Sequence, residues 1–342
     1  MKSPKFPIPF SLLDLAVVTE GSTIAEVIER SRDLAIQTES FGYNRFWMAE
    51  HHNMENIASS ATSILLGHVA EATQSIRVGS GGIMLPNHSP LIIAEQFGTL
   101  ATMYPGRIDL GLGRAPGTDQ VTAAAIREDR MQRVHKFPEH IKQLQNYLSA
   151  ENSESAVRAI PGEGTDVPIW ILGSSTDSAF LAAELGLPYA FASHFAPHQL
   201  LPATRIYRER FKPSAQLDRP YLMPGINVVV AETDEQAEYL ATSMLQMFMG
   251  VVTGDRKPMP PPVDDMNRIW NMHQKAAVEQ MLTYTFTGSI ETVQRKVEQF
   301  IEITDADELM IASYLYDYRE RVNSHKRFSE LMQSISTSAE SV

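Results

Sequence analysis

Runs of apolar residues alternate along the chain with segments in which apolar positions recur every three or four residues. The runs have the length and composition of buried strands, and the segments between them have helical periodicity. Strands are expected at residues 10–18, 45–50, 76–85, 107–112, 168–172, 189–192, 222–230 and 308–314. Helices are expected at residues 23–40, 60–72, 89–103, 130–148, 176–185 and 197–211, from residue 233 onward, and at 318–334.

Strands that alternate with helices in this way are typical of a closed parallel barrel. We therefore expect an α/β fold, a single-domain (β/α)8 TIM barrel over residues 1–342. An open doubly wound sheet is the alternative, but the number and length of the strands favour closure. The alternation is interrupted after strands 4 and 7, where insertions are expected. The second interruption contains four prolines within residues 257–263 and is expected to form a lid or rim.

Composition and charge narrow the possible partners. The formal net charge is −12 and there is no basic cluster, so nucleic acid is not an expected partner. The chain has no cysteine, which excludes disulfides and thiolate chemistry and fits a cytoplasmic location. Residues 1–10 lack the apolar core of a signal peptide, and no run of about 18 apolar residues would span a membrane.

The second apolar run ends in Glu50, His51 and His52, at the position where a barrel strand opens into a polar site. Side chains alternate along a strand, so His51 shares a face with Ala49, whereas Glu50 and His52 share the opposite face. Only one histidine can then point into the barrel mouth. A purely structural histidine pair is the alternative. No metal site is expected, because the sequence has no His-x-x-x-His pair with an intervening glutamate and no His-x-His on the first strand.

Three further strand ends carry residues suited to a flat, phosphorylated ligand. Glycines at 79–82 indicate either a bend or a place where a ligand meets the backbone. Arg114 leaves the fourth strand in a glycine-rich loop, and arginine suits anionic groups and flat π-systems. Small and hydroxyl residues at 173–178 open a helix whose N-terminus could bind a phosphate, although ordinary N-capping would use one of the same hydroxyls. His194 follows the sixth strand near the same mouth.

Taken together, four stretches resemble the bacterial luciferase-like flavin monooxygenase family. They are FWMAEHH at 46–52, IRVGSGGIMLPNHSPL at 76–91, AEQFGTLATMYPGRIDLGLGRAPG at 94–117, and WILGSS at 170–175 followed by AAELGLPYAF at 182–191. The similarity covers most of the barrel and looks closest to the luciferase-like group 1 subgroup, with a YhbW-like pattern.

The resemblance implies site residues. His51 matches the family's catalytic histidine, and Ser80-Gly81 matches a non-prolyl cis peptide under the flavin ring. Arg114 matches an arginine near the flavin phosphate, and Ser174, Ser175 and Ser178 match the phosphate-binding turn. The chain departs from luciferase itself at Gly113, where luciferase carries a reactive cysteine, so light emission is not implied.

The resemblance also implies an activity. The expected function is a flavin-dependent monooxygenase that uses reduced FMN and O2 to oxidise a small organic substrate. Because no second nicotinamide-binding domain is visible in the sequence, a separate NAD(P)H:flavin reductase is expected to deliver the reduced cofactor. An F420-dependent oxidoreductase on the same barrel and a non-catalytic flavin-binding protein are the alternatives. A homodimer is expected, since helices such as those at 60–72 and 89–103 pack against a second subunit in the family.

Overall fold

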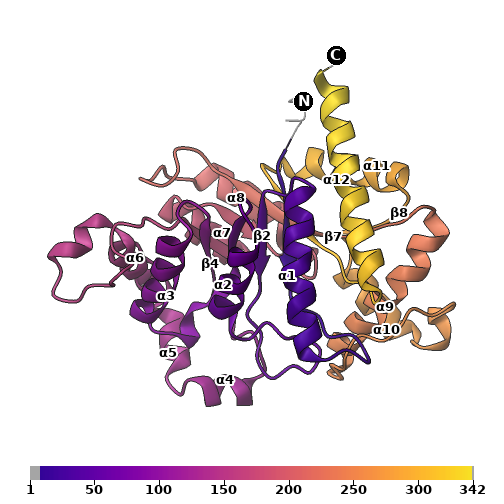
Figure 1. Ribbon diagram of the computed structural model, residues 1–342, viewed down its shortest axis with the longest axis horizontal. Helices are drawn as coiled ribbons and strands as arrows, with labels where there is room; N and C mark the ends of the chain where they lie inside the picture. The colour runs from indigo at the N-terminus through magenta and orange to yellow at the C-terminus, as the bar shows by residue number, and fades with distance from the viewer. Residues whose placement is uncertain (1–7, 341–342) are drawn as a thin grey trace.

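The protein is described by a computed structural model over residues 8–340, in which a parallel barrel is surrounded by helices (Figure 1). Adjacent strands pair in chain order from β1 to β7, β7 pairs with β9, and β9 pairs with β1. The expected single-domain (β/α)8 barrel is therefore confirmed. The strands are β1 (Phe10–Asp14), β2 (Arg45–Met48), β3 (Arg77–Met84), β4 (Ile108–Gly113), β5 (Ile169–Gly173), β6 (Tyr189–Phe191), β7 (Leu222–Val230), β8 (Thr285–Gly288) and β9 (Leu309–Ala312).

The strand β8 has no counterpart among the strands expected from the sequence. It pairs with Asn227–Val230 in the second half of β7, whereas β6 pairs with Leu222–Pro224 in the first half. β6 and β8 thus share one long neighbour, and eight strands close the barrel without β8. The sequence expectation failed here because β8 has four residues, of which only two are buried. That is too short for a clear apolar run.

Helices cover the outside of the barrel, and α1 and α12 lie next to each other (Figure 1). The α-helices are α1 (Ile24–Ser40), α2 (Thr62–Ala72), α3 (Pro90–Met103), α4 (Gln120–Ile126), α5 (Arg130–His135), α6 (Phe137–Leu148), α7 (Thr176–Leu185), α8 (Leu200–Arg210), α9 (Asp234–Thr253), α10 (Met272–Met281), α11 (Ile290–Thr304) and α12 (Tyr318–Glu340). The single helix expected at 130–148 is two helices that meet at Lys136. The break precedes Pro138, which has no N–H to continue the helical hydrogen bonds.

A buried network of charged groups closes the N-terminal end of the barrel. Asp109 on β4 accepts hydrogen bonds from Arg45 (2.6 Å) and Arg77 on the two preceding strands. Arg45 also bonds Glu308, at 3.1 Å, and Glu308 in turn accepts from Tyr221 at 2.8 Å. Both carboxylates are fully buried, and each is paired with a cation, as buried charges must be. These paired charges fill the N-terminal end of the barrel. A ligand site is therefore expected at the C-terminal end.

The proline-containing segment after α9 is held at both of its ends. Met259 donates its N–H to Val18 at 2.8 Å and accepts from the N–H of Glu20 at 2.9 Å, which attaches the segment to the loop after β1. Val263 donates to the hydroxyl of Thr242 on α9 at 2.8 Å. Of the two forms expected for residues 257–263, these anchors correspond to a rim rather than to a free lid.

Candidate active site

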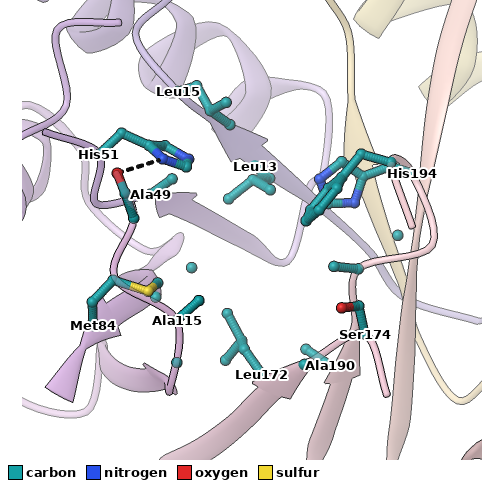
Figure 2. A pocket seen from close by; sticks show the side chains of 18 of the residues that line it. Leu13, Leu15, Ala49, His51, Met84, Ala115, Leu172, Ser174, Ala190 and His194 are labelled. Carbon is teal, nitrogen blue, oxygen red and sulfur yellow. Dashed lines mark hydrogen bonds between the residues drawn. The ribbon is translucent and has the colours of Figure 1, made fainter. Parts of the chain in front are cut away.

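A cavity of about 610 Å³ opens at the C-terminal ends of the strands, where barrel enzymes carry their sites. Its volume lies within the range of about 300–1,000 Å³ that is usual for small-molecule sites. The walls are largely apolar, and Figure 2 shows Leu13, Leu172 and Ala190 facing the space. Four of the polar groups at its surface come from separate strand ends: His51 after β2, Arg114 after β4, Ser174 after β5 and His194 after β6.

His51 points into the cavity, as strand alternation predicts (Figure 2). Its backbone N–H donates to the carbonyl of Ser59 at 3.0 Å. Its ring nitrogen Nδ1 lies 3.3 Å from the carbonyl oxygen of Gly117, which can only accept, so Nδ1 carries the proton. Burial lowers the pKa of His51, and the bond to Gly117 opposes this shift in part. The neutral ring therefore presents Nε2 as a proton acceptor.

Glu50 lies behind His51 and is fully buried. Its carboxylate is bonded to His52 at 2.8 Å and to His88 at 2.9 Å, and it accepts from the N–H of Met84 at 2.9 Å. Burial alone would raise the pKa of Glu50, but these hydrogen bonds outweigh burial and hold the pKa at about 2. Glu50 and His52 do not line the cavity. They fix the strand end from which His51 projects.

The glycine-rich part of β3 forms one wall of the cavity, with a correction to the sequence expectation. The non-prolyl cis peptide joins Gly81 to Gly82, and not Ser80 to Gly81. Ser80 is fully buried and its hydroxyl donates to the carbonyl of Gly111 at 2.9 Å, so it lies outside the cavity surface and the expected cofactor contact of Ser80 is not supported. Gly81, the other residue of the expected contact, lines the cavity together with Gly82. A Cβ on Gly82 would lie 2.8 Å from the carbonyl oxygen of Gly111, so bare backbone is required there.

The serines after β5 gather at the N-terminus of α7. Ser175 is the N-cap, and its hydroxyl accepts from the N–H of Ser178 at 3.5 Å. The hydroxyl of Ser178 donates to the carbonyl of Ser175 at 2.7 Å. Both residues and Ser174 line the cavity. The capping function expected of one hydroxyl is present, and the positive end of the helix dipole still faces the cavity.

Arg114 stands beside this turn. Its side chain is half exposed, and its nearest carboxylate is that of Asp177 at 3.8 Å. Arg130 and Arg256 also line the cavity and were not singled out from the sequence. Arg130 is 7% exposed and donates to the side chain of Asn87 at 3.0 Å and to the carbonyl of Arg114 at 2.9 Å. Because it begins a helix that carries several other charged residues, no sequence signal distinguished it.

Charge separates the cavity from the rest of the molecule. Among the described residues that line it there is no aspartate or glutamate, whereas Arg114, Arg130 and Arg256 are all present. The chain as a whole carries a net charge of −12. Three arginines in a lining without carboxylates make this space suited to an anionic ligand such as a phosphate, although Arg114 also has Asp177 beside it, outside the lining.

In the described part of the chain, residues 8–340, no group of three or more His, Asp or Glu side chains is arranged to hold a metal ion. None of the helices in this range combines the length and the apolar character that crossing a bilayer requires.

The sequence has close relatives along nearly its whole length. It is 52% identical over 325 residues to the protein YvbT of Bacillus subtilis strain 168, covering 95% of this chain and 96% of YvbT. It is 47% identical over 328 residues to a luciferase-like monooxygenase of Escherichia coli K12, covering 96% and 98%. The crystal structure of apo-MsnO8 superposes with a TM-score of 0.85 at 32% identity, covering 95% of this chain and 98% of that one.

A relative with a more specific name is the N-acetyl-S-alkylcysteine monooxygenase of Bacillus subtilis strain 168. It is 37% identical over 237 residues, which cover 68% of this chain and 70% of that protein. The family model described as luciferase-like monooxygenase matches residues 8–307. With that match over most of the barrel and with relatives of this similarity, the chain belongs to the luciferase-like monooxygenase family.

Proposed function

We propose that this protein is a flavin-dependent monooxygenase that uses reduced FMN and O2 to oxidise a small organic substrate. The observation that carries the proposal is the joint placement of three features in one cavity. These are a neutral histidine, a wall of bare glycine backbone, and a helix N-terminus with a nearby arginine, in a cavity whose described lining has no carboxylate. The proposal also agrees with the names of two relatives, a luciferase-like monooxygenase and an N-acetyl-S-alkylcysteine monooxygenase.

The residues present fit FMN. The backbone at Gly81 and Gly82 leaves a surface without side chains, which a flat ring system can approach closely. Ser174, the N-terminus of α7 and the guanidinium of Arg114 would hold the phosphate, since charge-assisted hydrogen bonds to phosphate are among the strong ones. Bound reduced flavin supplies two electrons to O2, so that one oxygen atom enters the substrate and the other leaves as water.

The chain's own contribution to the chemistry is centred on His51. Nδ1 stays bonded to the carbonyl of Gly117, which fixes the ring and leaves Nε2 as the atom that takes up and returns a proton. The lowered pKa keeps Nε2 free of a proton near neutral pH. The apolar walls, including Leu13 and Leu172, exclude water from the reacting atoms.

The anchored segment 257–263, as part of the rim, would help to exclude water from the cavity. A separate NAD(P)H:flavin reductase would deliver the reduced cofactor. The small-molecule substrate would enter from the same open end, and the working form would be a homodimer.

The test uses the purified protein with FMN, an unrelated NADH:flavin reductase and a substrate panel that includes N-acetylated S-alkylcysteines. We expect oxygen uptake that depends on substrate and that falls by about two orders of magnitude or more in His51→Ala, the usual contribution of a general base. A matched control is His68→Ala, whose partly exposed ring on α2 lies 3.1 Å from Glu29 on α1 and outside the cavity. Equal rates in His51→Ala and in the unchanged protein would contradict the proposal.

The same preparation separates the two cofactor alternatives. Titration with oxidised FMN and with F420, followed by the absorbance change of each, gives both affinities directly. Tighter binding of F420, with reduction of a substrate in the absence of O2, would replace the monooxygenase by an F420-dependent oxidoreductase. Binding of FMN without any substrate-dependent oxygen uptake across the panel would leave a non-catalytic flavin-binding protein.

A further inference from the structure

His194 lies on the short turn after β6 and faces the cavity across from His51 (Figure 2). The turn is fixed from several directions. Ala192 donates its N–H to the carbonyl of Gly173 at 2.9 Å, and the hydroxyl of Ser193 donates to the carbonyl of Gly225 at 2.6 Å. The side chain of Asn227 donates to the carbonyl of His194 at 2.5 Å. The backbone of His194 is therefore held by neighbouring strands on both sides.

The ring of His194 is positioned by packing rather than by polar contacts. It meets the ring of Phe195 edge to face, with the centroids 4.9 Å apart. A Cβ on Gly225 would lie 2.5 Å from Nδ1, so glycine on β7 makes room for the ring. The residue is 7% exposed, Nδ1 is completely buried, and neither ring nitrogen is hydrogen-bonded to any part of the chain between residues 8 and 340.

Four other histidines have at least one partner, although Nε2 of His325 and Nδ1 of His140 on α6 are also buried without one, and neither of these residues lines the cavity. His51 is bonded to Gly117, His52 and His88 to Glu50, and His325 to the hydroxyl of Tyr43 at 3.0 Å. An imidazole held in place without a partner forgoes at least one hydrogen bond that water would have given it. Nδ1 is completely buried against Gly225, so a molecule bound in the cavity can supply a hydrogen bond only to Nε2.

The surroundings define what kind of group can supply it. Burial, reinforced by the nearby His51, lowers the pKa of His194 to about 4, so the ring is neutral at physiological pH. A neutral imidazole offers no charge for an anion, and none of the three arginines of the lining contributes to the pKa shift of His194, which comes from burial and His51. The described cavity lining also has no carboxylate for a cation. The remaining surface in this part of the cavity is apolar, with Met223, Met247, Phe248 and Met310.

We propose that His194 is a substrate-orienting residue that donates a hydrogen bond from Nε2 to an uncharged oxygen acceptor, a carbonyl or hydroxyl, of the substrate. The oxygen lies between His194 and His51, and the apolar remainder of the substrate lies along the methionine-lined wall. The inference rests on the proposed function only for the identity of the reaction. The predicted hydrogen bond between ligand and His194 does not depend on that function. It names the substrate class as a neutral hydrogen-bond acceptor attached to an aliphatic chain.

The test measures binding without turnover. Intrinsic tryptophan fluorescence reports occupancy, because Trp47 lines the cavity. The probes are 2-octanone, its isostere 2-methyl-1-octene, octanoate and octylamine. Each is titrated into the unchanged protein, His194→Phe, His194→Gln and the control His198→Gln, which changes an exposed histidine four positions away. The affinity for FMN is measured on the same samples.

We expect 2-octanone to bind roughly tenfold more weakly to His194→Phe, with the alkene unchanged within about twofold, because one hydrogen bond is lost. His194→Gln keeps a donor and is expected to retain most of the affinity, and His198→Gln all of it. Equal weakening of ketone and alkene would overturn the proposal, since it would show a loss of shape alone. Tighter binding of octanoate than of 2-octanone would overturn the uncharged class.

A loss of FMN affinity in His194→Phe with unchanged ketone binding would assign the residue to the cofactor instead, and would also overturn the proposal. His194→Gln keeps the question answerable if His194→Phe fails to fold. Failure of the proposed function looks different. If FMN does not bind at all while the ketone pattern holds, the flavin assignment falls and the role of His194 in ligand binding stands.

Discussion

Glu50 shows how one buried side chain supports a site that it does not touch. It accepts hydrogen bonds at the strand end that carries His51, and it is ionised because those bonds outweigh the cost of burial. Sequence alternation correctly separated Glu50 and His52 from His51. It could not show that His88, far along the chain, shares the same carboxylate. A local sequence pattern does not show which distant segments of the chain are in contact.

Glu50→Gln should therefore destabilise the fold. The folded pKa of about 2 lies below the ordinary value of 4.5, so the stabilisation is present above pH 4.5 and is lost as the pH falls toward 2. At neutral pH the contribution is roughly 3 kcal/mol. Urea unfolding at pH 7 and pH 3 measures it: Glu50→Gln should lose stability at pH 7 and less at pH 3. The exposed Glu55→Gln is the control, and an equal loss in both variants would refute this account.

Arg256 should affect the pH at which activity falls as the solution is acidified. Burial is the main cause of the lowered pKa of His51, and the Arg256 cation lowers it further. Arg256→Gln is therefore expected to raise the pKa, so that activity begins to fall at a higher pH as the solution is acidified. The pH–rate profile of substrate-dependent oxygen uptake measures this shift. Arg268→Gln, an exposed change on the same connection, should leave the profile in place, and a shift of equal size there would argue against a local effect.

At the scale of elements, the strand at Leu222–Val230 was located from the sequence to the residue, whereas the first strand, expected at 10–18, ends at Asp14. The failures have physical reasons. Strand β8 is short and only half buried, and the helix expected at 130–148 breaks before Pro138. The cis peptide was placed one bond early, because several small residues follow one another and only their packing against β4 distinguishes them. Arg130 was missed for a similar reason. Its burial depends on contacts with Asn87 and Arg114, which the helical periodicity of its own segment does not reveal.

The close approach of β3 and β4 predicts the effect of a single methyl group. Gly82→Ala would place a Cβ 2.8 Å from the carbonyl oxygen of Gly111, which is backbone and cannot rotate away. We expect a loss of about 1–3 kcal/mol in the free energy of unfolding, typical of overpacking. Gly67→Ala on α2 is the control, because its Cβ would meet only Leu100, at an ordinary 3.5 Å. Equal stability of the two variants in urea would contradict the described packing.

For the whole molecule, the apolar side chains left at the surface predict self-association. On α2 and α3, which pack against each other, Ile64 is 72% exposed, Ile92 46% and Met103 59%. Large apolar side chains exposed on two adjacent helices favour contact with a second copy of the chain. We expect a dimer at micromolar concentration and a monomer for the double change Ile64→Glu with Ile92→Glu, measured by sedimentation. Ile303→Glu, an exposed position on α11, should leave the mass unchanged. A monomeric mass for the unchanged protein would remove the expectation.

The contrast between the carboxylate-free cavity and the acidic molecule around it has a kinetic consequence. An anion such as FMN is repelled at long range by the net charge of −12 and attracted only once it is close to the arginines. Salt screens interactions beyond roughly 10 Å at 0.1 M, and it screens short, partly buried contacts much less. Moderate ionic strength should thus raise the association rate constant of FMN. At most anion-binding sites added salt lowers this rate constant, because it screens an attraction. Stopped-flow measurement of the FMN association rate at increasing salt would show which effect dominates. A rising rate indicates repulsion by the net charge, and a falling rate indicates attraction by the arginines of the cavity.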